Sequence, residues 1–115
     1  MLTDKICIVT GGGSGIGRAI AIEMAHQRAG AVVIADIDED GGPETARLVA
    51  EAGSEARFIR TDLRKPAEIR DLMDATAEQF GGIDVLNNNA GRSIRRPLAE
   101  SLERWHDVER TMTLN

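Results

Sequence analysis

The sequence has no tyrosine, a single tryptophan and two phenylalanines, so aromatic residues make up 3% of its 115 residues. Its formal net charge is −5, and no basic stripe with interleaved aromatic residues is present. Because nucleic acids bind to basic surfaces, these features argue against a nucleic-acid partner.

Cysteine is nearly absent as well. Cys7, the single cysteine, lies within an apolar run, which predicts a small buried side chain in a reducing compartment and not a reactive thiol. No apolar run approaches the ~18 residues of a membrane span. The first predicted strand begins almost at Met1, so we expect no signal peptide. Together these features predict a soluble, cytoplasmic protein with no membrane partner.

Short apolar runs alternate with segments of helical periodicity. The runs at residues 6–9, 31–35, 56–59 and 83–86 predict strands, and residues 16–29, 44–51, 66–80 and 101–115 predict helices. This alternation is typical of a parallel sheet with right-handed crossovers. We predict an α/β fold with a Rossmann-type doubly wound sheet, of which residues 1–115 form one domain with the first four strands and four helices.

A glycine-rich stretch, Thr10-Gly11-Gly12-Gly13-Ser14-Gly15-Ile16-Gly17, joins the first strand to the first helix. A helix N-terminus offers unpaired N–H groups and a positive dipole end, and glycine lets a pyrophosphate approach the backbone. Gly11, Gly15 and Gly17 fit a tight turn, close ligand approach and close helix packing. A lone glycine cluster usually marks an ordinary loop, but this position between strand and helix predicts a dinucleotide site.

Asp36 is the first acidic residue after the second strand. In this fold a carboxylate there accepts hydrogen bonds from the adenosine ribose hydroxyls and repels a 2′-phosphate, which favours NAD over NADP. The alternative is a solvated loop acid, because Asp38, Glu39 and Asp40 follow directly.

Asp62 follows the third strand in the same way. Its carboxylate could accept from the adenine amino group, while the N–H of Leu63 donates to a ring nitrogen. The alternative is an acid that complements the dipole of the helix opening at Pro66.

Three asparagines, Asn87 to Asn89, end the fourth strand and lead into Ala90 and Gly91. Consecutive asparagines are poor strand formers, so we expect their amides to tie neighbouring strands and loops together or to face a ligand. The alternative is an asparagine-rich turn.

These motifs resemble the N-terminal part of a short-chain dehydrogenase/reductase. Thr10-Gly11-(x)3-Gly15-Ile16-Gly17 is similar to the family's cofactor loop, Asp36 to its ribose acid, Asp62 to its adenine contact, and Asn88-Asn89-Ala90-Gly91 to its fourth-strand motif. The resemblance implies hydride transfer between a nicotinamide cofactor and a small alcohol or carbonyl substrate, in a homo-oligomer. It assigns NAD binding to Gly11, Gly13, Ser14, Gly15, Ile16, Gly17, Asp36, Ile37, Asp62, Leu63, Asn89, Ala90 and Gly91.

Asn115 resembles the asparagine of the family's Asn-Ser-Tyr-Lys catalytic tetrad, which helps to hold a proton-relay water. Without a tyrosine the chain cannot contain the Tyr-x-x-x-Lys pair, so we predict that it is inactive alone. A non-catalytic nucleotide-binding or redox-sensing module is the alternative.

The family usually carries an apolar residue where Asn87 stands, so we expect this amide to find partners or to weaken the strand. Without a fifth strand, residues 83–86 would form an unpaired edge that recruits other chains.

The remaining candidates have weaker support. His26 and His106 are expected on exposed helix positions with no ligand partner nearby, so we predict no metal site. Arg92, Arg95 and Arg96 could attract an acidic substrate or form a solvated loop, and Trp105 is expected to pack.

Overall fold

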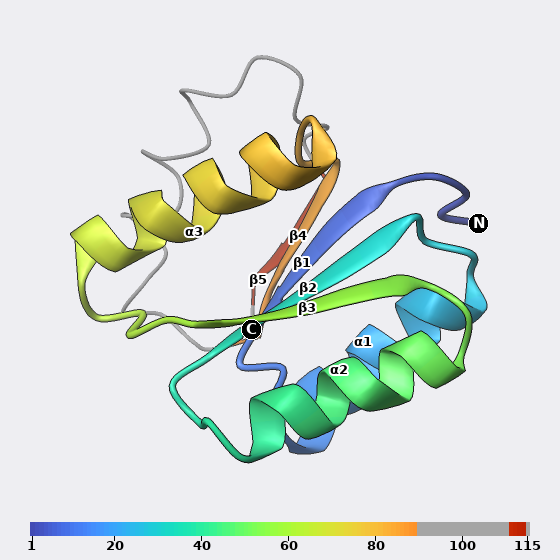
Figure 1. Cartoon of the computed structure of the whole chain (residues 1–115), viewed down its shortest axis with the longest axis horizontal. Coiled ribbons are helices and arrows are strands. Elements are labelled where there is room, and N and C mark those ends of the chain that lie inside the picture. Colours follow the sequence, from blue (N-terminus) through green and yellow to red (C-terminus); the bar gives the residue numbers. More distant parts are fainter. Residues whose placement is uncertain (90–110, 115) are drawn as a thin grey trace.

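The computed structural model describes residues 1–89 and 111–114 (Figure 1). Its elements in chain order are β1 (Ile6–Thr10), α1 (Gly15–His26), β2 (Ala31–Asp36), α2 (Gly41–Glu51), β3 (Glu55–Arg60), α3 (Pro66–Phe80), β4 (Val85–Asn88) and β5 (Thr111–Leu114). Strands and helices alternate up to β4, as the sequence predicts.

All the strands belong to one parallel sheet with the order β3-β2-β1-β4-β5. The chain winds outward from β1 to β3 and then crosses to β4 on the other side of β1. In such a doubly wound sheet, ligands bind where the strand order reverses, at the carboxyl ends of the strands. The predicted Rossmann-type architecture is confirmed. The point where the strand order reverses lies between the carboxyl ends of β1 and β4.

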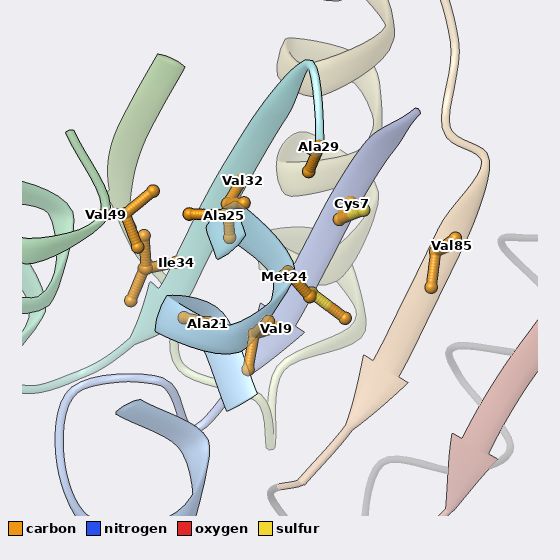
Figure 2. Close-up of a cluster of buried hydrophobic side chains, with 10 residues drawn as sticks. All are labelled: Cys7, Val9, Ala21, Met24, Ala25, Ala29, Val32, Ile34, Val49 and Val85. Carbon is orange, nitrogen blue, oxygen red and sulfur yellow. The ribbon is translucent and has the colours of Figure 1, made fainter. Parts of the chain in front are cut away.

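Helices cover both faces of the sheet. Figure 1 shows α1 and α2 on one face and α3 on the other. Figure 2 shows the first core cluster, in which Val9 and Ile34 of the sheet pack with Met24 of α1 and Val49 of α2. On the opposite face, sheet residues including Ile8 pack against α3. Because both faces of β1 and β2 are buried, their sequences are continuous apolar runs.

Helices α2 and α3 end just before the glycines that were predicted to stop them. Gly53 (φ +108°) and Gly81 (φ +86°) both adopt left-handed conformations that side chains disfavour. The predicted end of α1 was wrong, because the helix ends at His26 and not at residue 29. Arg28 takes the left-handed conformation (φ +68°), and the N–H of Ala29 donates to Met24 (3.1 Å) in a Schellman-type closure.

The fourth strand begins two residues later than predicted. Ile83 is buried like a strand residue, but β4 spans Val85–Asn88. The N–H of Asp84 donates to the carbonyl of Ile6 (2.8 Å), and its carboxylate accepts from the N–H of Ile6 (2.8 Å). This exchange joins the two segments just before the regular pairing of β1 with β4, and the strand includes Asn87 and Asn88.

Two expectations for the end of the chain are corrected. Residues 111–114 of the predicted last helix form β5, whereas 101–110 and 115 lie outside the described residues. Because β5 pairs in parallel with β4, the fourth strand is not an unpaired edge, and the sheet has a fifth strand. Among the described helices, none is long and apolar enough to cross a membrane.

Candidate cofactor site

The glycine loop lies at the carboxyl end of β1 and opens directly into α1. Gly11 (φ +68°) and Gly15 (φ +53°) adopt left-handed conformations. A Cβ built on Gly17 would lie 2.0 Å from the Gly11 carbonyl oxygen, whereas a Cβ on Gly15 would meet nothing within 4 Å. The three glycines therefore differ in role: Gly11 turns the chain, Gly15 faces open space, and Gly17 permits close packing.

Asp36, the last residue of β2, lies directly beside this loop. Its Oδ2 accepts a hydrogen bond from the N–H of Gly13 (2.8 Å), and its Oδ1 accepts from the N–H of Asp38 (3.1 Å). A Cβ on Gly13 would lie 2.7 Å from Oδ2, so a side chain at this position would force the Asp36 carboxylate to move. A carboxylate has about four lone-pair sites, so the half-buried Asp36 can accept further hydrogen bonds.

Two apolar side chains are exposed beside these polar groups. Ile16, in the first turn of α1, is 71% exposed, and Ile37, which follows Asp36, is 49% exposed. Ser14, the N-cap of α1, is also exposed and makes no side-chain capping bond. Single exposed apolar residues are common, and these become informative only because they flank the loop and its acid.

Asp62 is buried near the start of the loop that joins β3 to α3. Its carboxylate accepts from the backbone N–H of Arg64 (3.0 Å) and from both Nε (3.0 Å) and Nη2 (3.1 Å) of that side chain. These bonds with Arg64 lower the pKa of Asp62 to about 2. The N–H of Asp62 donates to Glu68 in the first turn of α3 (2.9 Å). The hydrogen bonds of the Asp62 carboxylate are thus with Arg64 and not with the amides of the helix, while Leu63 beside it is half-buried.

Thr10, at the end of β1, connects this strand to the asparagines of β4. Its hydroxyl lies 3.1 Å from Oδ1 of Asn88 and 3.3 Å from the carbonyl of Asn87, and it accepts from the N–H of Asn89 (3.0 Å). The expectation that the asparagines tie strands together is met here. Even so, Oδ1 of Asn87 and Nδ2 of Asn88 are buried without a hydrogen-bond partner among the described residues.

The sequence did not predict a role for Arg18, although its side chain contacts the glycine loop. Nη2 donates to the carbonyl of Gly13 (2.9 Å), and Nε donates to the hydroxyl of Thr45 on α2 (2.9 Å). An arginine one turn into a helix is common, so nothing in the sequence marks it out. The contact depends on α2 crossing close to the loop.

Other predicted residues lie away from this edge or outside the described residues. Cys7 is fully buried, and burial raises its pKa to about 12, consistent with an unreactive thiol. His26 is exposed, with Nδ1 3.8 Å from a carboxylate oxygen of Glu23, a partner that the sequence prediction overlooked. Across the part of the chain that the structure describes, no cluster of three or more His, Cys, Asp or Glu residues could hold a metal. Ala90, Gly91, Arg92, Arg95, Arg96, Trp105, His106 and Asn115 lie outside the described residues.

A doubly wound parallel sheet with a glycine loop and an acid at the end of the next strand defines a Rossmann-type dinucleotide-binding fold. The short chain dehydrogenase family profile matches residues 5–115, and the chain belongs to this family.

Curated relatives include a fatty acyl-CoA reductase of Mycobacterium tuberculosis, 46% identical over 114 residues, which are 99% of this chain and 38% of the reductase. An uncharacterized oxidoreductase of Thermotoga maritima is 40% identical over 111 residues, which are 96% of this chain and 43% of that protein. The chain thus spans about two fifths of the length of these relatives.

Solved structures agree with this assignment. NAD+-bound xylitol dehydrogenase superposes with a TM-score of 0.75 and 33% identity, over 79% of this chain and 35% of that chain. An NADH-dependent reductase in complex with NAD gives a TM-score of 0.71 and 40% identity, over 79% and 38% of the two chains.

Proposed function

We propose that this chain is the cofactor-binding part of an NAD-dependent oxidoreductase that transfers hydride between nicotinamide and an alcohol or carbonyl substrate. The observation that carries the proposal is the pairing of Asp36 with the N–H of Gly13 at 2.8 Å, which joins a ribose-binding acid to the phosphate-binding loop. When bound, NAD supplies the hydride chemistry, and the protein supplies binding and orientation.

The glycine loop fits a dinucleotide diphosphate. The space beside Gly15 is open, and the loop leads into the N-terminus of a helix of 12 residues. Amide hydrogens and the helix dipole at such a position favour a negative charge. We assign diphosphate binding to the backbone from Gly11 to Gly17, with Ile16 covering one side of the cofactor.

Asp36 is assigned to the adenosine ribose. Its hydrogen bonds with the N–H groups of Gly13 and Asp38 leave acceptor capacity for the two ribose hydroxyls. A 2′-phosphate at this place would meet a carboxylate at close range, so the proposal favours NAD over NADP. Ile37, exposed directly after Asp36, would cover the adenine side.

Asp62 and Leu63 are assigned to the adenine ring, and Asn89, Ala90 and Gly91 to the nicotinamide half. For Asp62 the adenine amino group must share the carboxylate with Arg64 or displace that side chain, which is 77% exposed and can turn outward. Asn115 is assigned to the proton relay through the family resemblance.

The family's acid–base tyrosine has no counterpart in these 115 residues. We therefore expect the chain alone to bind cofactor without turnover, which would be supplied by a longer protein. The relatives are named for different substrates, so the substrate is proposed only as an alcohol or carbonyl compound. Homo-oligomeric assembly, a cytoplasmic location and a single domain over residues 1–115 stay predictions.

Calorimetric titration with NADH and NADPH tests the proposal. We expect tighter binding of NADH, and we expect Asp36→Ala to reduce the difference by about tenfold, because one charged hydrogen-bond acceptor is removed. Glu39→Ala is the matched control, since it removes the same charge from the loop that directly follows Asp36, at a side chain that is 73% exposed. Equal affinity of the unmutated chain for both cofactors would refute the NAD assignment, and absence of binding would refute the function.

A further inference from the structure

Arg18 connects two segments that are far apart in the sequence. It lies in the second turn of α1, and its side chain reaches back over the glycine loop. Besides its bonds to Gly13 and Thr45, Nη2 lies 3.2 Å from the carbonyl oxygen of Gly41, the first residue of α2. Thr45 is fully buried, so this end of the arginine is anchored inside the molecule.

Gly13 is consequently held on both sides. Its N–H donates to Asp36 at 2.8 Å, and its carbonyl accepts from Arg18 at 2.9 Å. Fixing both groups of one glycine fixes its two backbone torsions, in a residue that is otherwise the least restrained of all. The Asp36 carboxylate therefore faces a donor whose position depends on Arg18.

Gly41 is held in a similar way from the α2 side. Its N–H donates to Oδ1 of Asp38 (2.9 Å), and its carbonyl oxygen lies near Arg18. A Cβ on Gly41 would lie 2.3 Å from the Gly13 carbonyl oxygen, which shows how closely α2 approaches the loop. The hydrogen bonds from Gly41 and Asp40, followed by the charge of Arg18, lower the pKa of Asp38. The acidic segment after β2 is thus fixed against the glycine loop from two directions.

We propose that Arg18 is a positioning residue that orients the Asp36 carboxylate through Gly13 and thereby sets the preference for NAD over NADP. This inference rests on the proposed function, because it assumes that Asp36 binds the adenosine ribose. Arg18 itself need not touch the cofactor. Its loss releases the Gly13 carbonyl, the loop moves relative to Asp36, and the hydroxyls of the ribose meet a less well-placed acceptor.

The test compares Arg18→Lys with the unmutated 115-residue chain in titrations with NADH and NADPH. Lysine keeps the positive charge but cannot span the three acceptors with one planar group. We expect Arg18→Lys to weaken NADH binding by about tenfold and NADPH binding by less than about threefold, which reduces discrimination. Arg47→Lys is the control, because Arg47 pairs with Glu44 and Glu51 on the outer side of α2. It should change neither affinity.

A double-mutant cycle with Asp36→Asn separates positioning from simple support of the loop. In the Asp36→Asn background, Arg18→Lys should change NADH affinity by less than about twofold, because there is no ribose acid left to orient. Thr45→Val, which removes the Nε acceptor with little change of shape, should act in the same direction as Arg18→Lys and serves if that variant unfolds.

The outcomes are distinguishable. Arg18→Lys could lower the affinity for NADH and NADPH equally, or lower NADH affinity equally with and without the Asp36 carboxylate. Either result would mean that Arg18 only supports the loop. It would overturn the inference and leave the proposed function intact. Unchanged affinities in both Arg18→Lys and Thr45→Val would also overturn it. If the unmutated chain binds neither cofactor, the proposed function fails and the inference fails with it.

Discussion

The two halves of the sheet's carboxyl edge differ in how completely their polar groups are paired. Beside β2, Gly13 has both backbone groups bonded, and Asp36 uses both carboxylate oxygens. Beside β4, Asn87 and Asn88 each keep one buried amide atom without a partner among the described residues. The partners of the first half all come from residues 13–45 of the chain. A short, contiguous segment can therefore pair its own polar groups at this edge, whereas the β4 side keeps unpaired buried atoms among the described residues.

The largest expected effect comes from the closest packing in the loop. Gly17→Ala places a methyl group 2.0 Å from the Gly11 carbonyl oxygen. Overpacking of this kind lowers the free energy of unfolding by about 1–3 kcal/mol, and we expect the upper end here because the neighbour is backbone. Chemical denaturation followed by circular dichroism measures it.

Gly15→Ala is the matched comparison for that variant. Its Cβ meets no atom within 4 Å, so the cost is the left-handed backbone alone, about 1–2 kcal/mol. We expect Gly15→Ala to stay folded and yet to lose NADH affinity, because the methyl group fills the open side of the loop. Retained affinity in a folded Gly15→Ala chain would contradict the assignment of this face to the diphosphate.

The unpaired amide oxygen of Asn87 gives the next largest effect. Replacing it with valine removes a buried acceptor that has no described partner, so we expect the free energy of unfolding to rise by about 1–2 kcal/mol. Asn88→Ala should lower it by a similar amount, because Oδ1 of Asn88 lies 3.1 Å from the Thr10 hydroxyl. If Asn87→Val destabilises the chain as strongly as Asn88→Ala, the two asparagines have the same role. The contrast between the unpaired oxygen of Asn87 and the paired oxygen of Asn88 would then not hold.

The smallest expected effect concerns Asp62 and Arg64. Because folding lowers the pKa of Asp62 to about 2 from its usual 3.8, the ionised carboxylate stabilises the fold above its unfolded pKa. This contribution disappears as the pH falls toward about 2. Arg64→Gln removes the largest cause of the shift, so the pKa should rise toward its usual value. The contribution to stability should then be smaller, and its loss should be complete at a higher pH.

Carboxyl carbon shifts measured by NMR across the acidic range report this pKa directly. Arg70→Gln, at an exposed position of α3, is the control and should leave Asp62 unchanged. An Asp62 pKa that does not move in Arg64→Gln would show that another group holds the carboxylate ionised.

Periodicity and glycine placement in the sequence predict most of this fold. The buried runs of β1 and β2 and the glycines after α2 and α3 lie where they were expected, because each depends on local backbone preference and burial. Asp36 could be placed beside the loop because parallel strands end at the same edge.

The features that were missed depend on contacts between distant segments. Residues 111–114 were expected to be helical, but pairing with β4 makes them a strand. The start of β4 depends on the bonds of Asp84 with Ile6, and the role of Arg18 depends on the first turn of α2. Long-range pairing overrides local propensity at each of these places.

A map of backbone amide shifts on titration with NAD tests the central claim most directly. The account predicts the largest changes at Gly13, Gly15 and Ile37, where the loop and the ribose acid meet. It predicts little change at Gly53 and Gly81, which precede strands at the opposite edge of the sheet. Changes confined to those opposite-edge glycines, with the loop amides unmoved, would contradict it.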